Sequence, residues 1–357
     1  MNTLFLKTLQ TAICGNCGSN ETFFSECNLC QLWKEAQKQS LDGIVLEGLV
    51  KNTYTDNEQE FQKTKIQWVA SIVQIEKRNE LVNICIQQLT DFFSKGNFRT
   101  CVLKGQGVAS LYPNPKRRRS GDIDLWVEGE RNDIVNFIRS KGVKIYDVHL
   151  VHATAEFFKD VPVEIHFCPS WMYNPFLNKK LKTFFDSQAS AQFAHYDETV
   201  GFAYPTVLFN LVHSMVHINR HVFEEGIGLR QLMDYYFILK HSSHEERTNA
   251  YNVLCSVGLR KFVGAVMYVM QQVFLLDEDV MLCVPNSILG SRLLDSVMAG
   301  GNFGMALGLK HGRNKLEKGL LQLKHNLQLM LPYANEAMWI PFFQVWHYGW
   351  RKKHGYL

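Results

Sequence analysis

The spacing of apolar residues divides the chain into three regions. In residues 66–95, IQWVASIVQIEKRNELVNICIQQLTDFFSK, apolar residues recur every three or four positions and charges fill the opposite side, which predicts a long amphipathic helix. LDGIVLEGLVKN, at 41–52, predicts a shorter helix, and the opening MNTLFLKTLQTAI predicts an amphipathic one. We therefore expect residues 1–97 to form a helical region.

From about residue 98 to 168 the apolar period changes to two, which is typical of strands. The strand candidates are RTCVL, DIDLWV, KIYDVHLVH, AEFFKD and PVEIHF. Two helical segments interrupt them, GVASLYP and RNDIVNFIRSKG, the second with Gly142 as its C-terminal cap. This pattern predicts a small α/β sheet domain over residues 98–203.

Helical periodicity returns at about residue 204 and continues toward the end of the chain. The four clearest segments are TVLFNLVHSMVHINRHV, GLRQLMDYYFILKHS, HEERTNAYNVLCSVG and LRKFVGAVMYVMQQVFLL. We therefore predict a C-terminal helical domain over residues 204–357. The expected fold class is α+β, with a small mixed β-sheet core flanked by N- and C-terminal helical regions.

Composition narrows the class of protein without identifying it. A hydrophobic share of 46% and a charged share of 20% are those of a globular protein. The net charge of +4 does not require a nucleic-acid partner. We expect no signal peptide and no transmembrane segment, because no run of about 18 apolar residues occurs. Nine scattered cysteines favour reduced thiols and a cytoplasmic protein.

A strand-to-helix turn at residues 101–107 offers a first candidate for ligand binding. The strand CVL runs into Lys104, Gly105, Gln106 and Gly107, where a helix is expected to begin. Glycines let a backbone approach a ligand closely, and N–H groups at a helix start attract anions. Lys104 adds a positive charge. Alone, this pattern is more often only a turn.

The segment GDIDLWV makes a metal site the stronger interpretation. Residues two apart on a strand face the same way, so Asp122 and Asp124 should project together while the apolar residues between them face the core. Adjacent carboxylates repel each other, and a divalent metal relieves that repulsion. In VPVEIHF, Glu164 and His166 likewise alternate with apolar residues. Three carboxylates from two neighbouring strands would form an oxygen site suited to magnesium. The plainer reading of each acid is a solvated strand face.

These motifs resemble the DNA polymerase β-like nucleotidyltransferase superfamily, with its glycine turn, Asp-x-Asp strand and later acid. More closely, the sequence is similar to the uncharacterised nucleotidyltransferase family over about residues 30–240. The residues that carry the resemblance are Leu103-Lys104-Gly105, Leu111-Tyr112, Arg118, Asp122-Ile123-Asp124-Leu125, Val127, Glu164, His166, His213, His217, Leu229-Arg230, Leu232 and Asp234.

The resemblance implies magnesium-dependent transfer of a nucleoside monophosphate to a hydroxyl or phosphate. Two Mg²⁺ ions and a nucleoside triphosphate, expected to be ATP, would bind at the catalytic acids Asp122, Asp124 and Glu164. The implied nucleotide-binding residues are Lys104, Gly105, Gln106, Arg118, Arg230 and Asp234. The acceptor is open: a small molecule, a protein or an RNA end. Gln106 departs from the superfamily pattern, which has Ser or Gly there. In the basic run 116–119 we assign function to Arg118 alone and read its neighbours as a solvated loop.

Other readings stay open beside this one. The same fold could belong to a catalytically weak or inactive, nucleotide-binding regulatory or toxin-like protein. Cys14, Cys17, Cys27 and Cys30 form two C-x-x-C pairs that could bind zinc, but the gap between them is short and the second pair is predicted to be helical, so we favour thiols without metal.

Two further features are read as structural. His213, His217 and His221 repeat every four residues on an apolar helix, where hydrogen-bonded structural histidines are expected, and Arg230 with Asp234 has the spacing of a salt bridge. The aromatic and basic tail, MWIPFFQVWHYGWRKKHGYL, is expected to pack on the core rather than on a membrane or on bases.

Overall fold

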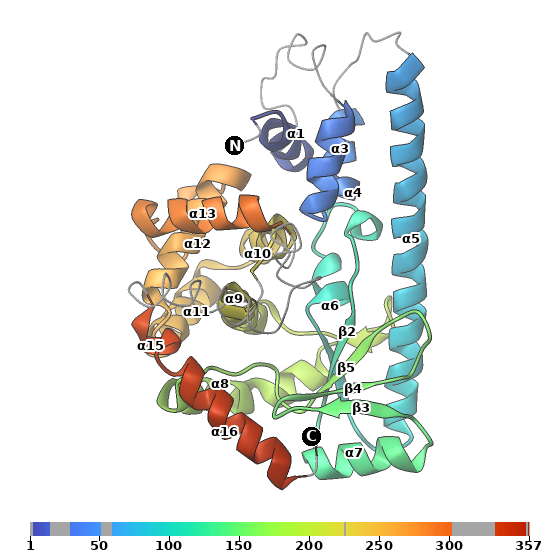
Figure 1. Cartoon of the computed structure of the whole chain (residues 1–357), viewed down its shortest axis with the longest axis vertical. Helices are drawn as coiled ribbons and strands as arrows, with labels where there is room; N and C mark the ends of the chain where they lie inside the picture. Colours follow the sequence, from blue (N-terminus) through green and yellow to red (C-terminus); the bar gives the residue numbers. More distant parts are fainter. Residues whose placement is uncertain are drawn as a thin grey trace.

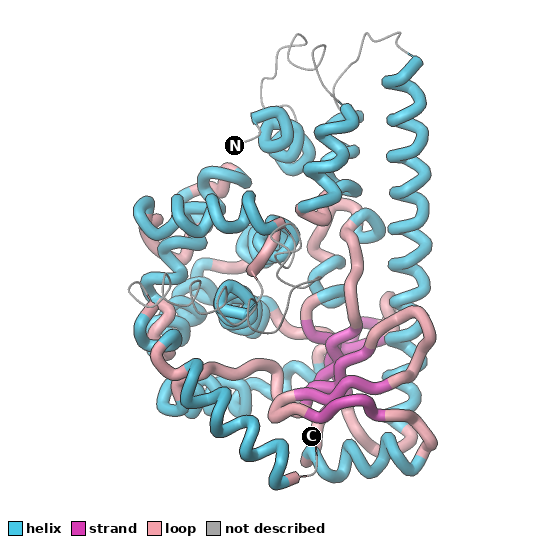
Figure 2. The backbone as a smooth tube through the Cα atoms, viewed as in Figure 1, coloured by secondary structure: helices cyan, strands magenta, loops and turns pink. Residues whose placement is uncertain are grey.

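The structure is a computed structural model that describes residues 3–14, 29–50, 59–224, 226–301, 333–354 and 356. The predicted fold class is confirmed: a mixed sheet is flanked by helices from both ends of the chain. Figure 2 shows the strands gathered at one end of the molecule, with helices around and above them. No helix in these ranges is long and apolar enough to cross a membrane.

The sheet has five strands in the order β1 (Thr100–Leu103), β2 (Ile123–Val127), β5 (Val163–His166), β4 (His152–Ala155) and β3 (Ile145–Val148). β2 and β5 run parallel, and the other neighbours are antiparallel. The prediction that RTCVL, DIDLWV and PVEIHF are neighbours is therefore confirmed. A separate pair, β6 (Tyr196–Asp197) and β7 (Phe202–Ala203), lies against β1.

Two strand predictions are wrong in detail. KIYDVHLVH was expected to be one strand, but it forms β3, a turn and the start of β4, and the His149 N–H donates to the His152 carbonyl across that turn. AEFFKD was expected to be a strand, but β4 ends at Ala155 and the rest is loop. Because a tight hairpin also alternates polar and apolar residues, the period alone did not locate the turn.

One face of the sheet is the core of this part of the molecule. Ile123, Leu125, Val163 and Ile165 are almost fully buried there, against α5 (Gln59–Ser94) and α7 (Arg131–Ser140). This packing follows from the alternation in both strands, since every second side chain is apolar. The other face carries Asp124, Glu164 and His166 and is turned away from α5.

The N-terminal region consists of the helices expected there: α1 (Thr3–Cys14), α3 (Leu29–Lys38), α4 (Asp42–Val50) and the long α5 beside the sheet (Figure 1). The basic run connects this region to the sheet through the short helix η1 (Pro115–Arg117). Arg119 binds both carboxylate oxygens of the fully buried Asp42, and Lys116 pairs with Glu80 on α5. The Arg119 side chain is 40% exposed, as a solvated loop predicts, but it also neutralises a buried charge, which was not expected.

The remaining helices lie on the side of the sheet that carries the acids. They are α6 (Gly105–Ala109), α8 (Pro175–Ala194), α9 (Val207–Glu224), α10 (Leu229–Lys240), α11 (His244–Ser256), α12 (Arg260–Phe274), η2 (Glu278–Val280) and α13 (Ser287–Gly300). We made no helix prediction where α8 lies. It begins at a Pro behind Asn174, whose side chain accepts from two backbone N–H groups as an N-cap.

The last described helices return to the sheet. α15 (Ala334–Ala337) leads into α16 (Ile340–Lys353), which crosses toward β3 (Figure 1). Arg351 near the end of α16 forms an ion pair with Asp147 on β3. The aromatic tail therefore packs on the rest of the protein in part, as expected, but Phe342, Val345, Trp346 and Tyr348 are exposed, so much of its apolar surface is not covered by the described residues. The boundaries proposed for three domains stay a prediction.

Candidate active site

The acids that sequence analysis singled out lie on adjacent strands. Asp124 on β2 stands directly opposite Glu164 in the parallel register with β5. His166, two residues further along β5, places Nε2 at 2.9 Å from Asp124 Oδ1 and 3.5 Å from Glu164 Oε2. Asp124, Glu164 and His166 each offer one ligand atom, and these atoms lie within 4.8 Å of one another. In the part of the chain that the structure describes, this is a compact group able to contact one ion.

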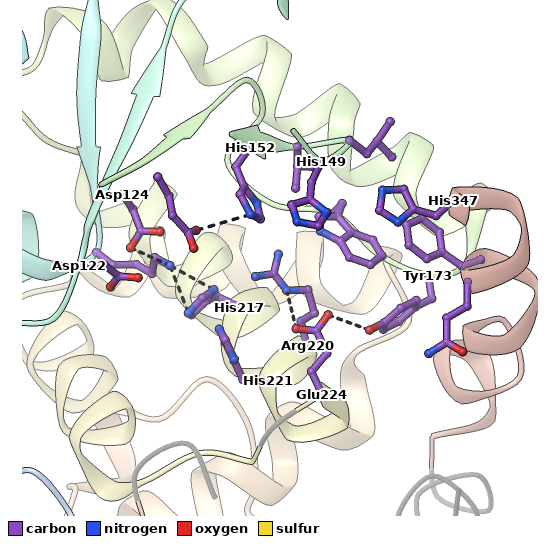
Figure 3. Close-up of a pocket in the computed structure, with 17 residues that line it drawn as sticks. Asp122, Asp124, His149, His152, Tyr173, His217, Arg220, His221, Glu224 and His347 are labelled. Carbon is purple, nitrogen blue, oxygen red and sulfur yellow. Dashed lines mark hydrogen bonds and ion pairs between the residues drawn. The ribbon is translucent and has the colours of Figure 1, made fainter. Parts of the chain in front are cut away.

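Asp122 comes directly before β2 and does not belong to that group. Its carboxylate nevertheless faces the same space as that of Asp124, as Figure 3 shows. The charge of Asp124 raises the pKa of Asp122 to about 6. This shift is the repulsion expected of two nearby carboxylates, and a bound cation would relieve it.

Lys104 neutralises Asp124 in this structure. Its Nζ lies 3.0 Å from Asp124 Oδ2 and within 3.5 Å of both ring nitrogens of His217. Burial favours a higher pKa for Asp124, but the charges and hydrogen bonds of Lys104 and His166 outweigh it and lower that pKa. Burial likewise favours a lower pKa for His166, whereas its hydrogen bonds to Asp124 and Glu164 raise it. Asp124 is therefore ionised and His166 donates to it.

The donor set fits magnesium in its chemistry. Asp122, Asp124 and Glu164 supply the carboxylate oxygens that Mg²⁺ prefers. His166 acts on Asp124 through a hydrogen bond, which is how groups behind a metal ligand commonly hold it in place. Lys104 occupies one oxygen of Asp124, so metal binding at that oxygen requires its ammonium group to move aside.

Two hollows meet at Asp122 and Asp124. The smaller, a cleft of about 50 Å³, lies on the side of the glycine turn. The larger, a cavity of about 590 Å³, lies on the side of Glu164. Lys104, Asp122, Asp124 and His217 line both. The carboxylates thus stand at a junction between two spaces.

Most of the residues predicted to bind nucleotide line the small cleft: Lys104, Gly105, Arg118, Arg230 and Asp234. Asp234 accepts two hydrogen bonds from Arg118, at 2.7 and 2.8 Å, and one from Tyr112 at 2.6 Å. Arg230 donates to the carbonyl of Arg119. The Nη1 atom of Arg118 is buried and has no hydrogen-bond partner within the described ranges, which leaves one donor that a phosphate oxygen could accept from.

Gln106 is the exception among these residues. Its side chain is buried against α5, where Nε2 donates to the Asn83 side chain at 2.7 Å, and it lines neither hollow. The structure therefore does not bring the Gln106 side chain to the site. Its bulk, which set this turn apart from the superfamily pattern, is directed away from the space where a ligand would lie.

Helix α9, which carries His213, His217 and His221, contributes more residues to the site than the sequence predicted. His213 is structural as predicted: it is fully buried, contacts the Pro169 carbonyl, and burial lowers its pKa to about 3. His217 instead contacts Lys104, and His221 lines the large cavity. Helical spacing places His213, His217 and His221 on one face, but it does not show which of them reach the site.

Several residues of the large cavity were not anticipated. They come from the turn between β3 and β4, the loop before α8, the end of α9, and α16: His149, His152, Trp171, Tyr173, Arg220, Glu224, Phe343, Gln344 and His347. The two histidines in H-L-V-H were the one available signal. They were hidden by the interpretation of that segment as a continuous strand.

The structure describes only two of the four cysteines that were considered as zinc ligands. Cys14 on α1 and Cys30 on α3 are both exposed, whereas Cys17 and Cys27 lie outside the described residues. α3 begins at Leu29, so Cys30 is helical as expected. The absence of zinc at these cysteines stays a prediction.

With the site in view, comparison with known proteins gives the family. Residues 26–275 match the family described as uncharacterised nucleotidyltransferase. The chain belongs to this family. The match contains the whole sheet, the glycine turn, all three acids and helices α9 and α10. It therefore supports nucleotidyl transfer in general, while α13, α15 and α16 lie beyond it. No curated protein matches the chain.

Proposed function

We propose that the protein is a magnesium-dependent nucleotidyltransferase that transfers a nucleoside monophosphate from a nucleoside triphosphate, with ATP as the expected donor, to an acceptor hydroxyl. The observation that carries this proposal is the position of Asp122 and Asp124 at the junction of two hollows, with Glu164 opposite Asp124. A transfer reaction needs two substrates to meet at one charged centre, and this arrangement supplies such a centre.

The triphosphate is assigned to the cleft side. Lys104 and Arg118 supply positive charge there, and Gly105, with φ +43°, has no side chain to obstruct a phosphate group. Lys104 would exchange its contact with Asp124 for one with a phosphate oxygen. Arg118 is held by Asp234, so its guanidinium is fixed in direction before a ligand arrives.

In the transfer step the acceptor oxygen attacks the α-phosphorus and forms a new P–O bond. The bond between the α-phosphorus and the oxygen that leads to the β-phosphorus breaks, and pyrophosphate leaves with its electron pair. The acceptor proton goes to Glu164, which lies on the side of the large cavity, and then to solvent. Bound Mg²⁺ ions would supply charge stabilisation for the phosphates and lower the pKa of the attacking hydroxyl.

The test begins with binding. Magnesium with ATP should raise the melting temperature of the parent protein, because it binds the folded state. Asp122→Asn and Asp124→Asn should remove that gain, and transfer of label from α-³²P-ATP to a cell extract should fall by about two orders of magnitude or more. Glu164→Gln should reduce the transfer rate more than it reduces nucleotide affinity.

Val127→Asn is the matched control, because Val127 lies on the same strand as Asp124 but on the core face, fully buried. It should impair folding, whereas the two Asn variants should stay folded. If the Asn variants bind magnesium and ATP as tightly as the parent, the site is assigned wrongly. If the parent binds the nucleotide but labels nothing in the extract, a non-catalytic nucleotide-binding function replaces the transferase.

A further inference from the structure

The large cavity extends from the carboxylates to a wall formed by α16. In Figure 3, Asp122 and Asp124 lie at one end, His347 of α16 lies at the other, and Arg220 and Glu224 lie between. A volume of about 590 Å³ is within the range of pockets that hold one small molecule. Under the proposed function, the donor phosphates contact Lys104 and Arg118 at the cleft, and we assign the outer part of this cavity, toward α16, to the acceptor.

The wall of α16 is well anchored. The ring of Phe343 stacks on Trp171 with centroids 4.3 Å apart, and the Glu336 carboxylate before α16 accepts from the Tyr173 backbone N–H at 2.8 Å. The half-buried rings of Trp171 and Phe343 present apolar surface to the cavity. Such surfaces beside a few polar groups are typical of sites for ring-shaped small molecules.

The charges of the outer cavity cancel. Among the described lining residues outside the acid site, the charged ones are Arg220 and Glu224, and Arg220 Nε is 3.5 Å from Glu224. Lys104, Asp122, Asp124 and Glu164 belong to the inner end of the cavity, where carboxylates outnumber cations. Glu224 also accepts from the Tyr173 hydroxyl at 2.8 Å. The outer cavity therefore offers hydrogen-bonding groups without an excess of positive charge.

The imidazoles support the same conclusion. Burial lowers the pKa of His347, so this imidazole on α16 is neutral near pH 7. A neutral imidazole donates one hydrogen bond and accepts another, which matches a hydroxyl group. His152 also places Nε2 at 3.9 Å from Glu164, so hydroxyl-binding groups continue up to the catalytic acids.

We propose that the acceptor is an uncharged, hydroxyl-bearing ring compound, a sugar or cyclitol, which binds in the large cavity with α16 as one wall. This inference rests on the proposed function, because it assigns the second substrate of the same site. An RNA end would bring phosphates, which Lys and Arg side chains neutralise. Among the described residues of the outer cavity the cation is Arg220, which already faces Glu224. A neutral ring with hydroxyls instead pairs with imidazole, the Arg220–Glu224 pair and Gln344, while its apolar edges contact Trp171.

The experiment uses Trp171 as the reporter. The full chain is labelled with 5-fluorotryptophan, and Trp171→Phe identifies its ¹⁹F resonance. With magnesium and α,β-methylene-ATP present, the protein is titrated with four neutral probes: myo-inositol, methyl α-glucoside, sucrose and trehalose. Inositol 1-phosphate, glucose 6-phosphate and glucuronate are the charged counterparts.

At least one neutral probe should shift the Trp171 resonance to saturation, and its charged counterpart should bind about tenfold more weakly or worse, a difference of about 1.4 kcal/mol. With α-³²P-ATP in place of the analogue, that neutral probe should become labelled. The proposal is overturned if no neutral probe shifts the resonance, or if the charged counterparts bind as tightly as the neutral ones.

Variants of α16 test whether its residues contact the bound ring or only support the fold. Phe343→Ala and Gln344→Ala should both weaken probe binding, whereas Tyr348→Ala, an exposed residue of the same helix that lines no part of the cavity, should leave it unchanged. Gln344 is exposed and keeps the test valid if Phe343→Ala loosens α16. Equal binding by all three variants and the parent would exclude α16 as the wall.

The two proposals fail in different ways. If magnesium and ATP stabilise the protein and Asp124→Asn removes this effect, but no ring binds, the acceptor class is wrong and the transferase stands. If a neutral ring shifts the Trp171 resonance in a protein that does not bind nucleotide, the cavity assignment stands and the transferase fails.

Discussion

Lys104 has a backbone conformation that a lysine rarely adopts. Its φ of 54° and ψ of −144° lie in a region that side chains with a Cβ disfavour. The position joins the end of β1 to α6, and the turn brings the ammonium group between Asp124 and His217. Strained residues of this kind cluster at functional sites.

This strain makes a prediction that is independent of activity. Lys104→Gly should be more stable toward urea than Lys104→Ala by about 1 kcal/mol, because both lose the side chain but only alanine keeps the disfavoured Cβ. Both variants should lose the stabilisation by magnesium and ATP. Equal stability of the two, or a more stable alanine variant, would show that the turn is not strained.

At the residue level, alternation along the strands was enough to locate the acids. DIDLWV and VPVEIHF each have one buried apolar face. It followed directly that Asp124 and Glu164 both lie on the other face of the sheet. The orientation of Gln106 did not follow, because it depends on Asn83 of α5, a partner 23 residues away. The inward position of His217 likewise depends on Lys104, which only the tertiary fold brings near.

At the level of elements, α15 and the loop before α8 are joined by a buried acid. Glu336 is almost fully buried and accepts hydrogen bonds from the backbone N–H groups of Tyr173 and Asn174. Burial nevertheless raises the pKa of Glu336 to about 7. Ionisation of Glu336 therefore lowers the stability of the fold at neutral pH. It weakens the contact between Glu336 and the loop before α8, which anchors α16.

The sign of the pH effect follows from this shift. The unfolded chain ionises Glu336 near 4.5, whereas the folded chain does so near 7, so its contribution to stability is complete below pH 4.5 and is lost as the pH rises to about 7. The loss is at most about 3 kcal/mol. Glu336→Gln keeps a carbonyl acceptor and should remove this loss.

The measurement is urea denaturation of the parent and Glu336→Gln at pH 5, 6, 7 and 8. The difference between the two proteins isolates the contribution of this residue, and the variant should gain on the parent as the pH rises. A constant difference across these pH values would mean that Glu336 ionises normally in the folded protein.

Helices and strands were predicted best where a single apolar period continues over many residues. The 36-residue helix α5 was expected over most of its length, because apolar residues recur every three or four positions from residue 66 onward. The hairpin at His149–His152 was missed because its turn residues continue the alternation of the strands on either side. Pairing between strands, which decides where a turn lies, is not visible in the period of one segment.

At the level of the whole molecule, the site is assembled from three parts of the chain. The sheet supplies the acids, α9 supplies His217 and Arg220, and α16 closes the far end of the cavity. Sequence periodicity identified helices in all three regions but could not determine which of them surround the acids. That depends on long-range packing, such as Trp171 on Phe343, residues 172 positions apart in the chain.

Metal content is a prediction for the chain as a whole. We expect protein purified without chelator to contain no stoichiometric zinc, because Cys30 lies in a helix and the two C-x-x-C pairs are close in sequence. Elemental analysis tests this directly. About one zinc per chain, lost when Cys14 and Cys17 are changed to serine, would contradict it.

The contact between Lys104 and Asp124 has a kinetic consequence. An ammonium group at 3.0 Å acts as a built-in counterion for Asp124, so a free divalent ion must displace it before it binds that oxygen. Phosphate oxygens compete for Lys104, and only their arrival leaves Asp124 without its counterion. Metal and nucleotide should therefore enter as one complex rather than in succession. Entry as one complex would protect the carboxylates from binding unsuitable cations between turnovers.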